Sequence, residues 1–304
     1  MAEIFFNGEF VPEEKAFVSV RTHALNYGTG CFEGIRAYYN AEEKELYVLK
    51  LKEHYERLLN SAKILRIKVD YTVQQLCDLT VELLVRNQFA SDAYIRPLLY
   101  KADTSVKVDL GSLKDGIAIY AVPLGDYLST QGIRVMTSTW RRVDDTAIPA
   151  RAKVTGSYIN TALAVDEAHR HGLDDAIFLS DDGHVAEGSA ANFFMVRHGK
   201  LITPPVSDNL LEGITRKLIM RFWEDMYSLP CIERRIDRTE LYIADELFLV
   251  GTGAQVAPII EVDYHTVGTA QVGPVASALT ERYQQMVRGQ ILEYRKDLTT
   301  CYGR

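Results

Sequence analysis

Glycine-rich and serine-containing turns are the first places in this sequence to search for chemistry. Gly28, Gly30 and Gly34 are spaced Gly-x-Gly-x-x-x-Gly, one residue off the spacing that cradles the pyrophosphate of a dinucleotide. No strand is predicted to lead directly into this run and no helix to begin there, so a nicotinamide-dependent oxidoreductase is a remote alternative. Gly188 and Ser189 lack the flanking pattern of a Gly-x-Ser-x-Gly nucleophile turn, so a serine hydrolase has no support.

Histidine and cysteine offer equally little for metal or redox chemistry. The sequence has seven histidines without a His-Glu-x-x-His pattern, and His169 and His171 would point in different directions on a helix because residues two apart do not share a face. The four cysteines stand far apart without a Cys-x-x-Cys pair, which argues against a zinc ribbon or a disulfide framework. We therefore expect no metal site.

The composition is that of an ordinary globular protein. A length of 304 residues suits about two domains, and 47% hydrophobic with 25% charged residues excludes disordered and fibrous classes. Lys and Arg number 34 against 41 Asp and Glu, a net charge of −7, which favours small metabolites over nucleic acid as partners. The longest apolar stretch, residues 117–124, is too short to span a membrane, and the N-terminus does not read as a secretory signal, so we expect a cytoplasmic protein.

Apolar spacing predicts the elements that must position any site. Asn7 and Gly8 indicate a hairpin turn near short strands at Ile4–Phe6 and Phe17–Val20. Apolar residues recur at helical spacing from Leu51 to about residue 66, which predicts an amphipathic helix. Further helices are predicted over about 73–89, 158–171, 214–226 and 275–294, and further strands over 46–49, 93–100, 116–122, 133–138, 176–179, 191–196 and 247–250.

Short strands outnumber helices in this pattern, and hairpins outnumber strand–helix–strand units. This favours a mixed α+β fold over a doubly wound parallel sheet. A turn-rich stretch from Pro123 to Gly132 marks the expected domain boundary. The predicted division is a first domain at 1–123, an interdomain loop at 124–135 and a second domain at 136–304.

Short motifs along nearly the whole chain together resemble a known family. They are the runs at 26–36, 54–58, 93–98, 150–160, 187–194, 211–216 and 251–254. In order and spacing they resemble the fold-type-IV pyridoxal-phosphate enzymes, specifically the branched-chain amino-acid aminotransferases. The resemblance implies an α+β, D-amino-acid aminotransferase-like fold with a small α/β N-terminal domain and a larger pseudo-barrel C-terminal domain. It also implies pyridoxal 5'-phosphate as cofactor and a homodimer or higher homo-oligomer.

The resemblance assigns the cofactor-binding residues one by one. Lys153 would be the catalytic lysine, whose amine forms a Schiff base with the cofactor aldehyde and then moves a proton. Glu187 would pair with the pyridine nitrogen, and Tyr158 would bond the phenolic oxygen of the ring. The phosphate would be held by a cation, by the start of a helix and by a turn. The cation would be Arg57, the helix start would be formed by Gly213, Ile214 and Thr215, and the turn would contain Thr252.

Substrate recognition is assigned in the same way. Tyr94 would meet the substrate α-carboxylate, and Arg96, on the same face of the strand, would bind the side-chain carboxylate of glutamate. The loop at 101–107, which the neighbouring subunit contributes in this family, departs from the expected glycine-rich version and leaves the breadth of the pocket open. The remaining pocket residues would be Tyr27, Phe32, Gly34, Thr252 and Gly253.

The implied reaction is a ping-pong transamination through Lys153, in which leucine, isoleucine or valine and 2-oxoglutarate give branched 2-oxo acids and L-glutamate. D-amino-acid or (R)-amine transaminases and aminodeoxychorismate lyase share the lysine and glutamate positions, and a side activity toward (R)-amines stays open. The matches at Tyr27, Phe32 and 94–96 favour the branched-chain enzyme. A non-catalytic binding protein on this scaffold is a remote alternative, because every catalytic residue type is present.

Overall fold

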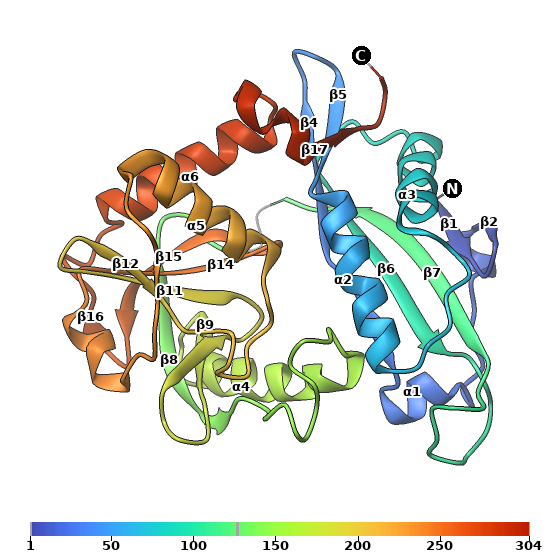
Figure 1. Ribbon diagram of the computed structural model, residues 1–304, viewed down its shortest axis with the longest axis horizontal. Helices are drawn as coiled ribbons and strands as arrows, with labels where there is room; N and C mark the ends of the chain where they lie inside the picture. The colour runs from blue at the N-terminus through green and yellow to red at the C-terminus, as the bar shows by residue number, and fades with distance from the viewer. Residues whose placement is uncertain (1, 126–127, 304) are drawn as a thin grey trace. The chain divides into compact units, whose positions relative to one another are not determined.

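The structure, a computed structural model, describes residues 2–125 and 128–303, which divide into two compact units (Figure 1). The first unit comprises Met1–Gly125, Ala152–Ser157 and Gln285–Arg304, and the second comprises Asp126–Arg151 and Tyr158–Gln284. The short segment around Lys153 and the C-terminal residues thus belong with the first unit, unlike in the predicted ranges 1–123 and 136–304. Residues 126 and 127 of the predicted loop 124–135 lie outside the described residues, and residues 133–135 begin strand β8 (Ile133–Arg141).

The first unit is built on an eight-stranded sheet with the order β17-β5-β4-β6-β7-β1-β2, and β3 pairs with β6. All of these pairs are antiparallel. Asn7 and Gly8 have positive φ angles and form the predicted hairpin turn between β1 and β2. The strands are β1 (Glu3–Phe6), β2 (Glu9–Pro12), β3 (Gly30–Phe32), β4 (Ile35–Asn40), β5 (Glu45–Leu49), β6 (Ala93–Lys101), β7 (Asp115–Pro123) and β17 (Leu298–Thr300).

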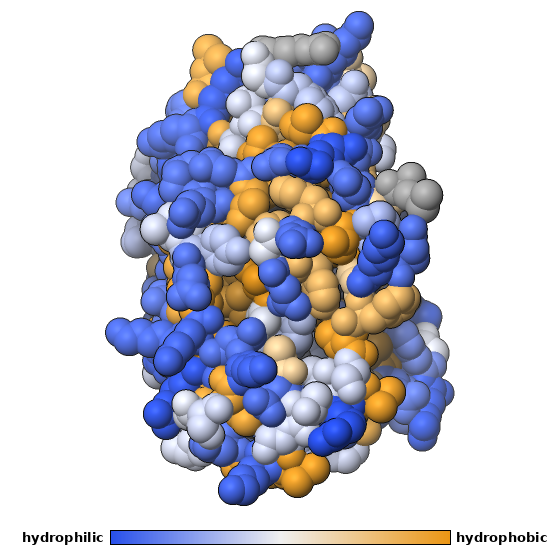
Figure 2. Space-filling view, turned by 90° about the vertical axis from the view of Figure 1, so that its right-hand side faces the viewer, coloured by the Kyte–Doolittle hydropathy of each residue, from blue (hydrophilic) through white to orange (hydrophobic). Residues whose placement is uncertain are grey.

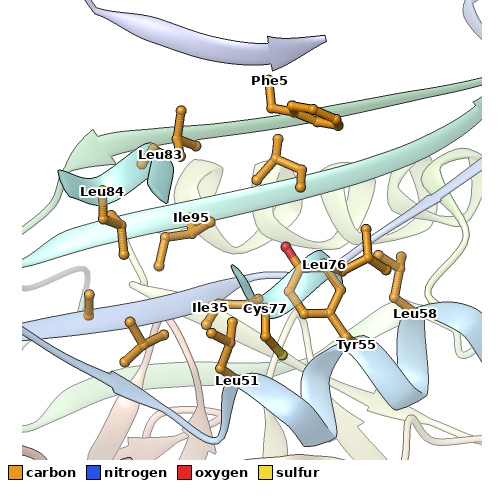
Figure 3. Packing of buried hydrophobic residues seen from close by; sticks show 14 of the residues in the cluster. Phe5, Ile35, Leu51, Tyr55, Leu58, Leu76, Cys77, Leu83, Leu84 and Ile95 are labelled. Atoms are coloured by element: carbon orange, nitrogen blue, oxygen red, sulfur yellow. The ribbon is translucent and has the colours of Figure 1, made fainter. Parts of the chain in front are cut away.

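Helices α2 (Leu51–Ile64) and α3 (Val73–Arg86) pack on one face of this sheet. Figure 3 shows their apolar side chains with Ile35 and Ile95 of the sheet, in the core of the unit. Because successive strand residues point to opposite faces, Arg36 on β4 and its partner Tyr94 on β6 lie on the other face. The short helix α1 (His23–Tyr27) precedes β3, and a 3-10 helix at Leu292–Asp297 precedes β17.

The second unit is built on a nine-stranded sheet with the order β10-β9-β8-β15-β14-β11-β12-β13, and β16 pairs with β15. Strand β8 is parallel to both of its neighbours, β9 and β15, whereas β15, β14 and β11 form antiparallel pairs. The further strands are β9 (Asp175–Leu179), β10 (Val185–Gly188), β11 (Asn192–Arg197), β12 (Lys200–Thr203), β13 (Ile232–Glu233), β14 (Glu246–Gly251), β15 (Gln255–Val262) and β16 (His265–Thr266).

Three longer helices accompany this sheet in the described part of the chain. Helix α4 (Tyr158–Arg170) packs Ala164 and Ala168 against Phe178, and α5 (Ile214–Tyr227) contributes buried residues that include Phe222. Helix α6 (Pro274–Val287) carries the chain from the second unit into the first. A hydrophobic cluster that includes Val135 and Leu249 forms the main core of the unit.

Two predicted elements are wrong. Residues 17–19 form no strand, and Phe17 and Val20 are 74% and 82% exposed, so their apolar pattern does not reflect a place in a sheet. The predicted helix at 275–294 ends at Val287, because Gly289 adopts a positive φ that interrupts the helix.

Three further features of the described residues are the hydropathy of one surface, the length of the helices and the grouping of metal-binding side chains. Figure 2 shows hydrophilic residues over much of one side of the molecule, with apolar residues gathered towards its middle. Among the described residues, no helix is long and apolar enough to cross a membrane. Within residues 2–125 and 128–303, no group of His, Cys, Asp and Glu side chains is arranged to hold a metal ion.

Candidate active site

Lys153 lies in the first unit, where its backbone is fixed on both sides. Its amide donates to the Ser61 hydroxyl of α2 at 3.2 Å, and its carbonyl accepts from the Phe32 amide at 3.1 Å. Its amine lies 5.2 Å from the centre of the Phe32 ring. The lysine is half-buried, so its backbone is fixed while the side chain stays partly accessible.

The glycine-rich run packs against the Lys153 segment. The Thr155 hydroxyl donates to the Gly28 carbonyl at 2.9 Å, and a Cβ on Gly28 would lie 2.7 Å from the Gly156 Cα. Gly28 also has a φ of +67°, which disfavours other residues. The glycine at position 28 therefore permits a close backbone approach within the protein, and this explains its place without a dinucleotide.

Four of the predicted pocket residues come together beside Lys153. The Tyr94 hydroxyl accepts from the Arg96 guanidinium at 2.6 Å, and that guanidinium lies 4.2 Å from the centre of the Phe32 ring. A Cβ on Gly34 would lie 2.5 Å from the Tyr94 hydroxyl, so only glycine leaves room for this tyrosine. The group presents an apolar wall, a hydroxyl and a guanidinium, which suits a substrate with both apolar and anionic parts.

Arg57, the predicted phosphate-binding cation, forms an ion pair that the sequence prediction did not include. Its Nε and Nη2 donate to the two carboxylate oxygens of Glu33, each at 2.7 Å. His54 Nδ1 lies 2.8 Å from the same carboxylate. Burial alone would raise the pKa of Glu33, but the Arg57 charge and the hydrogen bonds from Arg57 and His54 outweigh it and hold this pKa at about 2.

Tyr27 is placed away from these pocket contacts. It lies on α1, where its ring meets His23 and its hydroxyl donates to the Val106 carbonyl at 3.1 Å. His23 Nε2 lies 3.0 Å from the Lys107 carbonyl. These contacts join Tyr27 to the loop at 101–107.

In the second unit, Glu187 stands near the end of β10 among groups that stabilise its charge. Its carboxylate lies 2.8 Å from Arg142 Nε and accepts from the Asn192 side-chain amide at 3.1 Å. The backbone amide of Leu211 also donates to it at 3.3 Å. The side chain is 8% exposed, so this is a buried carboxylate with an adjacent cation.

The predicted phosphate-binding helix begins close to that carboxylate. Gly213 is the N-cap of α5, and Ile214 and Thr215 form its first turn, whose amides lack partners within the helix. A Cβ on Gly213 would lie 1.8 Å from the Asn192 side-chain oxygen. Glycine is therefore required for the helix start to approach Asn192, and first-turn amides without partners in the helix suit an anion.

Thr252, Gly253 and Tyr158 complete the set in the second unit. Thr252 and Gly253 lie in the turn between β14 and β15, beside Gly251, which pairs with Gln255. Tyr158 is the first residue of α4, and the first turn of that helix is tied to the Ser189 carbonyl by the Thr161 hydroxyl at 2.8 Å. All three residues thus stand at chain reversals or helix starts, as binding groups often do.

The supporting residues Glu33, Ser61, Arg142 and Asn192 were missed. Glu33 and Asn192 lie inside motifs used for the prediction, so their polar character was the available signal. Ser61 is four residues after Arg57, and its hydroxyl donates to the Arg57 carbonyl at 3.0 Å. Nothing local in the sequence marks Arg142, because its partner is on another strand.

Comparisons with known proteins show the family to which the chain belongs. The model of the family "Amino-transferase class IV" matches residues 30–262. The probable branched-chain-amino-acid aminotransferase of Aquifex aeolicus is 45% identical over 301 residues, which cover 99% of this chain and 97% of the relative. The branched-chain aminotransferase of Thermoproteus uzoniensis, solved with norvaline, superimposes with a TM-score of 0.95 at 44% identity and 99% coverage of both chains.

A further solved structure contains the cofactor. The branched-chain amino acid aminotransferase of Thermobaculum terrenum, solved in its PLP-form, has a TM-score of 0.94 at 35% identity, with 98% of both chains covered. This protein therefore belongs to the class IV aminotransferase family. Within it, the predicted likeness to the branched-chain amino-acid aminotransferases and the type IV α+β fold are confirmed.

Proposed function

We propose that this protein is a pyridoxal 5'-phosphate-dependent aminotransferase that transfers the amino group of branched-chain L-amino acids to 2-oxoglutarate. The observation that carries the proposal is the placement of the Lys153 amine over the Phe32 ring, in the unit that also gathers Gly34, Tyr94 and Arg96. The relatives described above carry the same activity in their names.

Each unit offers chemistry that suits the cofactor. The first unit contributes a half-buried amine at Lys153 and a guanidinium at Arg57. The second contributes the buried Glu187 carboxylate and a helix start at Gly213, where a larger residue would collide with Asn192. An aldehyde, a phosphate and a basic ring nitrogen are the groups that such residues bind. We propose as cofactor-binding residues Arg57 and Lys153 of the first unit and, in the second unit, Tyr158, Glu187, Gly213, Ile214, Thr215 and Thr252.

The protein's own residues then have separate tasks. When bound, the cofactor supplies an electron sink that allows the bond to the α-hydrogen to break. The Lys153 amine accepts that proton and returns it, and Phe32 on one side of it limits access of water. Arg142 forms an ion pair with the Glu187 carboxylate, which would in turn hold a proton on the ring nitrogen.

The proposed reaction needs one pocket that accepts both the apolar side chain of a branched amino acid and the acidic side chain of glutamate, and we propose that Arg96 allows this. Its guanidinium lies over the rings of Phe32 and Tyr94, so a pocket with an apolar, aromatic wall also holds one cation. The side-chain carboxylate of glutamate or 2-oxoglutarate meets the guanidinium, with Tyr94 positioned for the α-carboxylate. We propose that Thr252 and Gly253 of the second unit donate backbone amides to the substrate α-carboxylate.

We further propose that the protein is a homodimer that works in the cytoplasm. Val106, in the loop that contacts Tyr27, and Val108, just after that loop, are 79% and 77% exposed, and neighbouring exposed apolar side chains are typical of an interaction surface. A second copy would cover them, and Tyr27 would then act with this loop beside the partner's pocket. A Val106→Asp variant that shifts the light-scattering mass to that of a monomer supports this, and a monomeric parent protein contradicts it.

Initial rates with a panel of amino donors test the function. With 2-oxoglutarate as acceptor, we expect L-leucine to exceed D-alanine and (R)-1-phenylethylamine by about a hundredfold or more, which corresponds to about 3 kcal/mol of discrimination. A higher rate with D-alanine or the (R)-amine would replace the proposed substrate class by a D-amino-acid or (R)-amine transaminase. Absence of turnover with every donor would refute the proposal.

A further inference from the structure

The carboxylate of Glu33 is one of the most enclosed charged groups in the first unit. Its side chain is 0% exposed, and it lies between Phe32, which contacts Lys153, and Gly34, which makes room for Tyr94. The Glu33 amide donates to the Pro97 carbonyl at 3.0 Å, so the backbone is fixed on β6 as well. Burying a charged side chain costs several kcal/mol, so the charge of Glu33 must be compensated by the groups around it.

The Glu33 carboxylate holds the guanidinium of Arg57 in one plane. Two N–H groups of Arg57 meet its two oxygens at 2.7 Å, which is the bidentate arrangement that fixes both the position and the rotation of a guanidinium. A single contact would leave that group free to turn. The Arg57 side chain as a whole is largely enclosed, with 14% exposed.

His54 supports the same carboxylate in a defined protonation state. Since the pKa of Glu33 lies at about 2, its carboxylate is ionised at neutral pH and only accepts hydrogen bonds. His54 must therefore carry a hydrogen on Nδ1, which lies 2.8 Å from the carboxylate. Burial lowers the pKa of His54 despite the nearby carboxylate, so the imidazole is neutral and donates through this nitrogen.

The same helix connects Arg57 to the lysine. The Arg57 carbonyl accepts from the Ser61 hydroxyl at 3.0 Å, and that hydroxyl accepts from the Lys153 amide at 3.2 Å. Glu33 thus fixes the cation at one point of α2, while Ser61 fixes the lysine backbone one turn further along. The two points keep the Arg57 guanidinium and the Lys153 backbone at a constant separation.

We propose that Glu33, supported by His54, is a positioning residue that orients Arg57 toward the phosphate of the cofactor, an inference that rests on the proposed function. Glu33 touches neither cofactor nor substrate in this account. It acts by removing the freedom of the guanidinium before the phosphate arrives, which lowers the entropy cost of binding the phosphate.

The inference is tested by comparing pyridoxal 5'-phosphate with pyridoxal, which has the same aldehyde and ring but no phosphate. In the full-length chain stripped of cofactor, the Glu33→Gln variant places an amide where Arg57 and His54 both donate, so one of these donors must turn away. We expect the dissociation constant for pyridoxal 5'-phosphate, read from its absorbance on Lys153, to rise about tenfold or more, and that for pyridoxal to change less than about twofold.

Two controls make the readout specific. Glu56→Gln removes an exposed carboxylate from the residue beside Arg57, where Glu56 makes only a 3.8 Å ion pair with Lys52, and should leave both constants unchanged. In an Arg57→Met background, Glu33→Gln should add no further loss of phosphate-dependent affinity, because its effect passes through Arg57.

Each outcome separates this inference from the proposed function. If the parent protein binds neither aldehyde, the proposed function fails. If it binds both and Glu33→Gln weakens them equally, or weakens neither, the positioning role of Glu33 is refuted. Should Glu33→Gln not fold, Glu33→Asp decides instead. It keeps the charge but withdraws the carboxylate by one methylene, and the same phosphate-selective loss is expected, whereas unchanged binding of the phosphate form overturns the inference.

Discussion

Arg142 Nε lies 2.8 Å from the carboxylate of Glu187, and both side chains are almost fully enclosed. The pair joins the segment that follows strand β8 to strand β10 in the second unit. Asn192 and the Leu211 amide complete the surroundings of the carboxylate, and each of these neighbours is a donor. These donors compensate the charge of the enclosed carboxylate, and the proposed function uses that charge to pair with the ring nitrogen of the cofactor.

Replacing Arg142 tests this relationship. Arg142→Met leaves a buried carboxylate without its cation, so we expect kcat to fall by about tenfold or more and the free energy of unfolding to fall by about 3 kcal/mol. Arg142→Lys should restore part of both. Arg141→Met, at an exposed neighbour, is the matched control and should change neither. A kcat for Arg142→Met equal to that of the control would contradict the assigned role.

Arg96 should matter for one half-reaction far more than for the other. In Arg96→Met, the side chain still covers Phe32, but the guanidinium that meets a second carboxylate is lost. We expect single-turnover kcat/KM for L-glutamate to fall about thirtyfold, which corresponds to about 2 kcal/mol, and that for L-leucine to fall less than about threefold. Equal losses for the two amino acids would mean that Arg96 does not select between them.

Gly34 should tolerate no side chain. A Cβ there would lie 2.5 Å from the Tyr94 hydroxyl, so in Gly34→Ala the tyrosine must move away from Arg96. We expect KM for L-leucine to rise by about tenfold, a loss of about 1.4 kcal/mol. Gly125→Ala is the control, since a Cβ at Gly125 has no atom within 4 Å. An unchanged KM in Gly34→Ala would show that the Tyr94 position is unimportant for binding.

The low pKa of Glu33 predicts a loss of stability in acid. Its pKa is about 2 in the folded chain, below the value of about 4.3 for an unperturbed glutamate, so its contribution is complete above about pH 4.3 and is lost as the pH falls toward 2. Urea unfolding measures this contribution as the difference between the parent protein and Glu33→Gln. That difference should shrink by about 1.5 kcal/mol between pH 7 and pH 3. The same difference at both pH values would be inconsistent with the ion pair.

Much of the fold could be predicted from the sequence, because it rests on local signals, whereas the roles of the named site residues stay predictions. Amphipathic spacing from Leu51 predicts α2, and the motif around Lys153 is continuous in the chain. The strand expected at Phe17–Val20 is wrong because apolar residues on an exposed segment carry the same alternation as a half-buried strand.

The contacts that support the site residues could not be predicted from local sequence patterns. Glu33 bonds to Arg57, 24 residues further along the chain, and Arg142, just after β8, pairs with Glu187 on β10. Each pair therefore forms only when the chain has folded. The membership of Lys153 in the first unit is likewise a consequence of packing. The amide of Lys153 bonds to Ser61, and nothing in the residues around 153 specifies that distant partner.

The most direct measurement of the central claim is the site of covalent attachment of the cofactor. The protein with bound pyridoxal 5'-phosphate is reduced with borohydride, digested, and analysed by mass spectrometry. We predict a phosphopyridoxyl label on Lys153, no label in Lys153→Ala, and none on the buried Lys101, whose amine is held by Asp115 at 2.8 Å and by the Arg66 carbonyl at 2.7 Å. A label on a different lysine, or no label on the parent protein, would contradict the account.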